Sequence, residues 1–176
     1  QNTIRGVFPV WSYQQIDARM YGFDLDAQLK INENFNYKGR FSYVNGEDLS
    51  NNQPLILMLP PNFSNSIEFS NAKWKNFYFK IENQTVLQQK RFPLFNPTIN
   101  IYENGEEVEK ILDLSTPPAA YSLWNIQTGF NLTKNFSAGM NITNVFNKNY
   151  KDYLNRMRFF SYEMGRNFIF NVKYNF

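Results

Sequence analysis

Residues 21–43 read YGFDLDAQLKINENFNYKGRFSY, and apolar and polar side chains alternate along both halves of this stretch. From Tyr21 to Ile31 the odd positions are apolar, whereas the even positions carry glycine, carboxylates, an amide and a lysine. A period of two places successive side chains on opposite faces of a β-strand. The polar triplet at 32–34 interrupts the pattern before it resumes at Phe35. The stretch therefore predicts two antiparallel strands joined by a tight turn.

The same alternation recurs along the rest of the chain. Further strands are predicted to include residues 66–70, 77–82, 124–132, 136–143 and 167–176. This gives about seven strands of about ten residues each, with few helix signals. The connections alternate too. Three-residue turns are predicted near positions 33, 72 and 134, and long polar segments at roughly 46–63, 84–120 and 147–161.

Composition excludes several classes of protein. Aromatic residues make up 18% of the 176 residues, and charged residues make up only 19%. This composition excludes a disordered chain. The mean hydropathy is −0.52, and no run of about 18 apolar residues could form a transmembrane helix. The net charge of +3 comes without a Lys/Arg run, so no nucleic-acid partner is expected.

The lengths of the connections distinguish a membrane barrel from a soluble sandwich. Outer-membrane barrels have short turns at the periplasmic end and long loops at the extracellular end, whereas sandwich loops need not alternate. The apolar face is rich in Phe and Tyr, and aromatic residues lie near strand ends, as in interfacial girdles: Tyr43, Trp74, Trp124, Phe146, Tyr174 and Phe176. We therefore predict an all-β fold, a transmembrane antiparallel β-barrel with a polar lumen.

No catalytic or metal-binding constellation is predicted. The chain has no Cys and no His, which removes the usual nucleophile pairs and zinc sites. Asp24 and Asp26 share one strand face but lack an apolar pocket, so we expect no enzyme, no cofactor and no metal site. The acidic run from Glu103 to Asp113 lacks the ligand spacing of a calcium loop. It is interpreted as a solvated loop with one helical turn through residues 108–112.

The C-terminal motifs carry a resemblance to a known family. Residues 144–150 read NVFNKNY, 153–156 read YLNR and 165–167 read GRN, before an alternation that ends at Phe176. Together these motifs resemble the last two strands of TonB-dependent outer-membrane receptors. Further similar motifs lie upstream, at 9–13, 21–24, 54–55, 60–61 and 117–121, so the resemblance runs over nearly the whole chain.

The resemblance implies a 22-stranded barrel with a plugged lumen, of which residues 1–176 would be the C-terminal part, with about the last seven strands. Nothing in the chain matches the family's plug domain or energy-coupling box. It implies a location in the outer membrane of a Gram-negative bacterium and energised uptake of a scarce nutrient, most often an iron complex of the siderophore type. The implied partners are outer-membrane lipid, the barrel-assembly machinery, a metal-complex ligand, and a TonB-type energy-coupling protein that acts through the missing N-terminal part.

Two groups of residues are candidate sites under this interpretation. The segment 147–166 combines basic and aromatic side chains. These suit an anionic ligand through charge-assisted bonds and stacking. The predicted ligand-binding residues are Tyr153, Arg156, Arg158 and Arg166. Contacts that only stabilise the loop are the alternative. The terminal residues Val172, Tyr174 and Phe176 resemble the assembly signal of barrel proteins, with an aromatic anchor at the interface as the alternative.

Two other interpretations fit the pattern. The chain could form a complete eight-stranded barrel with a structural or adhesive role, in which Phe8 to Ile16 supplies the missing strand. It could also form a soluble β-sandwich that binds carbohydrate through exposed aromatic residues. Dependence on detergent would distinguish the sandwich from both barrels.

Overall fold

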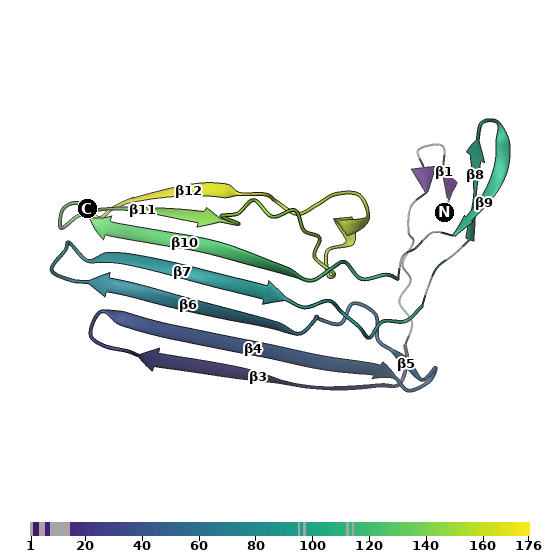
Figure 1. Ribbon diagram of the computed structural model, residues 1–176, viewed down its shortest axis with the longest axis horizontal. Coiled ribbons are helices and arrows are strands. Elements are labelled where there is room, and N and C mark those ends of the chain that lie inside the picture. The colour runs from purple at the N-terminus through teal and green to yellow at the C-terminus, as the bar shows by residue number, and fades with distance from the viewer. Residues whose placement is uncertain are drawn as a thin grey trace.

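One curved antiparallel sheet dominates the computed structural model, which describes residues 2–3, 6–7, 15–94, 96, 98–111, 113 and 115–176. The strands follow the order β12-β11-β10-β7-β6-β4-β3, with the short β5 paired to β4 (Figure 1). Their bounds are β3 Ala18–Lys30, β4 Phe35–Asp48, β5 Gln53–Pro54, β6 Asn62–Asn71, β7 Phe77–Val86, β10 Tyr121–Asn131, β11 Phe136–Thr143 and β12 Asn167–Tyr174. Every strand predicted by alternation is present.

Two hairpins and a short helix stand outside this sheet. The hairpins are β1 (Asn2–Thr3) with β2 (Gly6–Val7) and β8 (Thr98–Glu103) with β9 (Glu106–Ile111). The 3-10 helix η1 spans Arg156–Phe159. No helix in the described part of the chain is long and apolar enough to cross a membrane.

The connections differ in length at the two ends of the sheet. At one end, residues 31–34, 72–76 and 132–135 join the strands, so these turns are longer than the three residues predicted. Polar side chains hold them: Asn32 Oδ1 accepts from the backbone N–H groups of Asn34 and Phe35, at 2.8 and 2.9 Å. Such side-chain turns explain the extra residues. At the other end lie the long segments 49–61, 87–120 and 144–166.

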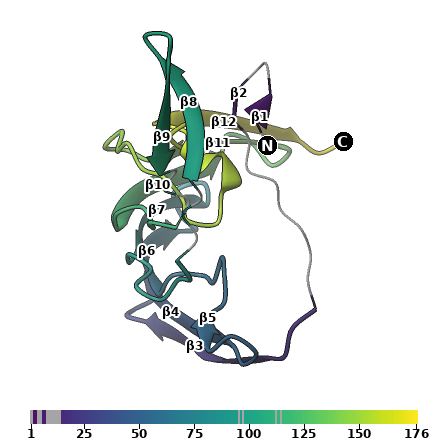
Figure 2. The ribbon, with the colours of Figure 1, turned by 90° about the vertical axis from the view of Figure 1, so that its right-hand side faces the viewer.

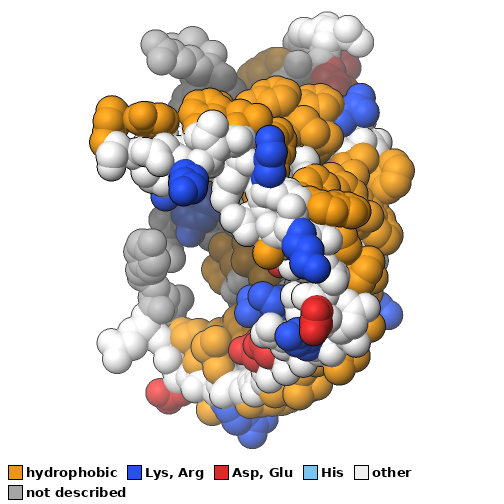
Figure 3. All heavy atoms as spheres, turned by 90° about the vertical axis from the view of Figure 1, so that its left-hand side faces the viewer, with side chains coloured by type: hydrophobic (Ala, Val, Ile, Leu, Met, Phe, Trp, Pro, Cys, Tyr) orange, Lys and Arg blue, Asp and Glu red, His pale blue; other side chains and the backbone are white. Residues whose placement is uncertain are grey.

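The strand register separates an apolar face from a polar one. Phe23 lies opposite Tyr43, and its ring centroid is 5.9 Å from that of Tyr43. On the other face Asp26 lies opposite Arg40, whose Nε donates to Asp26 Oδ1 at 2.7 Å. The sheet curves into an open arc (Figure 2), and hydrophobic side chains cover most of its convex side while charged side chains gather on the concave side (Figure 3).

The exposed apolar face is inconsistent with a β-sandwich. Phe23, Leu25 and Phe170 are 53%, 60% and 72% exposed on the convex face. Beside the main sheet, the described residues form only two two-stranded sheets, so no second sheet covers these side chains. The sheet order starts at β12 and ends at β3, and the described strands do not close a barrel. Most of the eighth strand proposed for a small barrel, residues 8–14, lies outside the described residues.

The acidic run from Glu103 to Asp113 forms a hairpin, and the predicted helical turn is wrong for residues 108–111, which belong to β9. Asn104 and Gly105 have φ angles of 54° and 88°, the left-handed values that a two-residue hairpin turn requires. Glu103 and Lys110 form an ion pair across the two strands. Leu112, the last residue of the predicted helical turn, lies outside the described residues.

Candidate functional site

The loop 144–166, between β11 and β12, folds onto the long-loop end of the concave face. Tyr121 and Leu123 of β10 and Val86 of β7 form a small buried cluster there, each 9% exposed or less. The ring of Tyr150 packs on that of Tyr121, with centroids 4.5 Å apart. Tyr121 Oη also donates to Asp152 Oδ2 at 3.0 Å. The loop is thus anchored to the main sheet by aromatic packing and a charge-assisted hydrogen bond.

Asn144 organises the start of the loop. Its side chain is only 3% exposed, and its φ of 50° turns the chain out of β11. Its Nδ2 donates to the carbonyl of Lys148 at 2.9 Å, and its Oδ1 accepts from the backbone N–H of Lys148 at 2.8 Å. Its own backbone N–H donates to Asn125 Oδ1 at 3.0 Å. Asparagine suits this position because it tolerates a positive φ while its amide replaces missing backbone partners.

Asn147 joins the two ends of the loop. Its Oδ1 accepts from the backbone N–H of Arg166 at 2.9 Å. A Cβ on Gly165 would lie 2.6 Å from the same oxygen, so a larger residue there would displace the Asn147 side chain from this contact. The motifs at 144–150 and 165–167 therefore contact each other. This contact is a physical reason for both motifs to be present in one chain. Sequence reasoning identified both motifs but not their contact.

Tyr153 and Arg158 form the interior of the loop. Both are 5% exposed. The guanidinium of Arg158 lies 4.9 Å from the ring centroid of Tyr153 and 4.3 Å from that of Phe159, and its Nη1 donates to the Tyr153 carbonyl at 2.5 Å. Burial lowers the pKa of Arg158, against the opposing influence of Tyr153 and Asp152. The cation is therefore held by two rings and a carbonyl.

The loop 144–166 also contacts the segment 49–61 at the same end of the sheet. The backbone N–H of Leu57, in the segment 49–61, donates to the Tyr153 phenol. Leu57 has a φ of 53°, an unfavourable value for a leucine, so this contact holds a strained backbone. Burial raises the pKa of Tyr153, since the phenolate would lose its water. The loop 144–166 and the segment 49–61 are thus fixed to each other through one neutral tyrosine.

This arrangement predicts that the two loops separate in alkali. Because the folded pKa of Tyr153 is raised, its contribution to loop stability is complete below the unfolded value of about 10 and is lost as pH rises through the folded value. Hydrogen exchange of residues 144–166, measured from pH 8 to pH 11 and corrected for intrinsic rates, should show protection that falls above about pH 10. Y153F should lose less protection over this range, while Tyr150, whose pKa burial also raises, and the buried Tyr121 remain in both proteins. An equal loss in Y153F would contradict the prediction.

The four predicted ligand-binding residues do not form one cluster. Tyr153 and Arg158 come together, but they face each other inside the loop. Arg156 is exposed at the start of η1. The exposed Arg166 guanidinium lies 5.8 Å from the ring centroid of Phe168. Phe168 pairs with Ile142 of β11, and Ile142 belongs to the apolar face. Periodicity could not show this, because it does not determine which way a loop side chain points.

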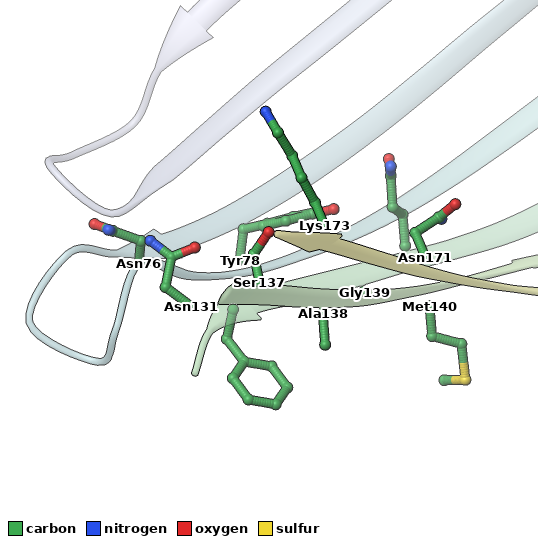
Figure 4. Close-up of a pocket in the computed structure, with 11 residues that line it drawn as sticks. Asn76, Tyr78, Asn131, Ser137, Ala138, Gly139, Met140, Asn171 and Lys173 are labelled. Carbon is green, nitrogen blue, oxygen red and sulfur yellow. The ribbon is translucent and has the colours of Figure 1, made fainter. Parts of the chain in front are cut away.

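The concave face carries polar hollows along its length. One, at the short-turn end, has a volume of about 220 Å³ and includes Tyr78, Asn171 and Lys173 in its lining. Figure 4 shows these side chains on one side of the sheet and Met140 on the other. The Tyr78 ring covers Gly129, where a Cβ would lie 2.6 Å from Tyr78 Cε1. The glycine therefore makes room for an aromatic ring that lies flat on the wall.

A second hollow, of about 350 Å³, lies between charged residues on the same face. Lys80 and Glu82 line it and form an ion pair at 2.6 Å. Across the described residues, no three His, Cys, Asp or Glu side chains gather in a way that could hold a metal ion. Paired charges and polar side chains along this face suit a surface that contacts water.

Several solved structures of other proteins are similar to this chain. No family model and no curated protein sequence matches this chain. The copper transporter OprC matches with a TM-score of 0.72 and 19% identity, over 92% of this chain and 24% of that chain. The ferripyoverdine receptor of the outer membrane of Pseudomonas aeruginosa matches with a TM-score of 0.65 and 17% identity, over 93% of this chain and 20% of that chain.

A third structure, the complex of FpvAI with pyocin S2, matches with a TM-score of 0.65 and 17% identity, over 92% of this chain and 20% of that chain. The chain thus spans between a fifth and a quarter of the length of these proteins. At this level of identity the likeness shows the fold: an antiparallel sheet that forms part of a larger barrel.

Proposed function

We propose that this chain, which has the fold of part of a TonB-dependent receptor barrel, belongs to an outer-membrane receptor that takes up a metal complex. The observation that carries the proposal is a sheet with one apolar and one polar face that matches such structures over nine-tenths of its length. An apolar convex face suits lipid and a polar concave face suits a water-filled lumen. The matched structures include a copper transporter and a ferripyoverdine receptor.

Residues 1–176 would form the C-terminal part of the barrel, and the plug domain and energy-coupling box would belong to other parts of the same protein. The edges of the sheet support this. All 13 residues of β3 are exposed, and the described strands leave one side of β3 and one side of β12 without a neighbour. Lipid offers no hydrogen-bond partner, so both edges must pair with further strands in the membrane.

The proposal includes the receptor's surroundings. The barrel would lie in the outer membrane of a Gram-negative bacterium, inserted by the barrel-assembly machinery and energised through a TonB-type protein that contacts the N-terminal part. The chain would bind and pass its cargo without chemical change, so it would not act as an enzyme, and nucleic acid would not be a partner.

The cargo we propose is an anionic iron complex of the siderophore type. The loop 144–166 supports this choice, because it carries exposed cations such as Arg156 beside aromatic side chains such as Tyr162. Lys151 Nζ lies 5.1 Å from the Tyr162 ring centroid, and an anionic chelate could contact both the cation and the ring.

Uptake by whole cells tests the proposal. A deletion strain would be complemented with the full-length protein and supplied with ⁵⁵Fe-siderophore complexes or with ⁶⁴Cu. We expect uptake of an iron complex that requires the protein and stops when a protonophore collapses the proton-motive force. Protein-dependent copper uptake alone would overturn the iron assignment. Accumulation that ignores the protonophore would overturn energised transport.

The C-terminal residue gives a separate prediction about assembly. Asn175 is bound to the last turn, because its N–H donates to the Asn135 carbonyl at 2.9 Å and its carbonyl accepts from Asn135 Nδ2 at 2.9 Å. The rings of Tyr174 and Phe176 meet edge to face, with centroids 5.1 Å apart.

If the terminal aromatic residue is the assembly signal, F176S should reduce several-fold the amount of full-length protein that runs as a folded, heat-modifiable band. F170S, on the exposed apolar face of the same strand, is the matched control. Equal loss in both variants would favour a simple interfacial anchor.

A further inference from the structure

The long-loop end of β3 and β4 carries an arginine cluster on the apolar side of the sheet. Arg19 lies opposite Glu47, two positions beyond the pair of Tyr21 and Asn45. Since side chains two apart on a strand share a face, Arg19 and Glu47 lie on the same convex side as Tyr21. They do not share the concave face with the charged residues of the lumen, such as Arg40.

The cluster is built around one carboxylate. Glu47 Oε2 accepts from Arg19 Nη2 at 2.6 Å, and Glu47 Oε1 accepts from Arg91 Nη2 at 2.6 Å. Two cations share one anion, which leaves an excess of one positive charge. The side chain of Glu47 is 25% exposed, whereas those of Arg19 and Arg91 are 62% and 48% exposed. The carboxylate therefore holds both guanidinium groups in place while most of their N–H groups face outward.

The position of the cluster along the strand matches the headgroup region of a bilayer. Phe35, at the short-turn end of β4, packs its ring on Phe69 at 5.0 Å and begins the apolar band. With a rise of about 3.3 Å per residue and a tilt of about 40°, Glu47 lies about 30 Å above Phe35 along the membrane normal. The apolar band of such barrels is about 25 Å tall, so the guanidinium groups emerge just beyond it.

A buried donor lies beside the cluster. Asn45 is 3% exposed, and its Nδ2 has no hydrogen-bond partner among the described residues. It lines a small cavity of about 20 Å³ together with Arg91 and Gln89, which is enough for one water-sized atom. Gln89 is itself fixed, since its Nε2 donates to the Met58 carbonyl at 3.0 Å. The neighbourhood thus supplies further donors beside the two guanidinium groups.

We propose that Arg19, Arg91 and Glu47 form a binding site for the phosphate group of an outer-leaflet glycolipid. Guanidinium groups bind phosphate through paired, charge-assisted hydrogen bonds, and a cation at the interface attracts an anionic headgroup while the neighbouring apolar face contacts its acyl chains. The site faces the bilayer rather than the lumen, so its ligand differs from the transported cargo. The inference rests on the membrane orientation proposed above.

Native mass spectrometry of the detergent-solubilised full-length protein would test the site. The protein would be titrated with bisphosphorylated lipid A, with the same lipid after phosphate removal, and with bisphosphorylated lipid A in the presence of excess inorganic phosphate. We expect one tightly retained lipid that requires its phosphates and resists inorganic phosphate. Equal retention of the dephosphorylated lipid, or complete displacement by inorganic phosphate, would overturn the lipid site.

Variants make the test specific to these residues. R19Q/R91Q should lower lipid retention at least about tenfold, the effect of roughly 1.4 kcal/mol. R40Q is the matched control, because Arg40 makes a similar exposed ion pair on the concave face and should leave retention unchanged. R91Q alone removes one of the two guanidinium groups and should lower retention by a smaller factor. Unchanged retention in R19Q/R91Q or in R91Q, or equal loss in R40Q, would overturn the proposal.

The outcomes for the lipid site and for transport remain distinguishable. Folding of each variant is read from its heat-modifiable band, and R91Q, which changes no residue of the main sheet, still decides the question if the double variant fails to assemble. Failure of the lipid site alone leaves a folded barrel and normal uptake. Failure of the proposed function appears as absent protonophore-sensitive uptake, whichever lipid is bound.

Discussion

Gly22→Ala is expected to prevent assembly of the barrel. Gly22 lies opposite Val44 where β3 and β4 approach closely, and a Cβ at this position would overlap the backbone carbonyl oxygen of Tyr43. The overlapping atom belongs to the backbone, so no side-chain rotation can relieve it, and the strands would have to separate. The cost should be about 3 kcal/mol or more. The folded, heat-modifiable band of the full-length protein in outer-membrane fractions should fall to a small remainder.

A control on the same strand makes this result specific. Leu25 is 60% exposed on the convex face, so L25V removes bulk without adding a backbone clash. We expect this variant to assemble like the parent protein. Normal assembly of G22A, or an equal defect in L25V, would show that the close approach of the two strands is not required.

The second large effect is expected from Arg158→Met. This change removes the donor to the Tyr153 carbonyl and the cation between the rings of Tyr153 and Phe159, and it leaves a buried carbonyl without a partner. The loss should be about 3 kcal/mol for the loop 144–166. Hydrogen exchange in that loop should then accelerate about 100-fold, since about 1.4 kcal/mol corresponds to a factor of ten.

Arg156→Met provides the comparison for this loop. Arg156 is exposed at the start of η1, two residues away, so its replacement should accelerate exchange in the loop far less than that of the buried Arg158. If Arg156 meets the anionic cargo, the same variant should reduce uptake at low ligand concentration. Similar exchange rates in R156M and R158M would contradict the interior role of Arg158.

The sheet was predictable from the sequence because its two faces meet different surroundings. Lipid on one side and water on the other impose a strict alternation, as in the stretch from Tyr21 to Tyr43, and every strand carrying that signal is present. Connection lengths were predictable for the same reason, apart from one or two turn residues. The resemblance to TonB-dependent receptors agreed with the fold of the matched structures.

The loops were less predictable because their structure depends on contacts between distant residues. The basic and aromatic composition of 147–166 suggested a ligand surface, yet Arg158 and Tyr153 are used to hold the loop together. The Asn104-Gly105 pair is a strong hairpin signal between two alternating segments. The acidic charges around it favoured a solvated loop in our interpretation, and the turn signal was overlooked.

The hairpin of β8 and β9 also has a practical consequence. Its strands contact each other and no other strand in the described part of the chain, and it projects beyond the end of the sheet (Figure 1). A foreign peptide inserted between Asn104 and Gly105 would therefore disturb neither the main sheet nor the loop 144–166. In the full-length protein this position would serve as a site for surface display, where an epitope tag would report from living cells which end of the sheet faces outward.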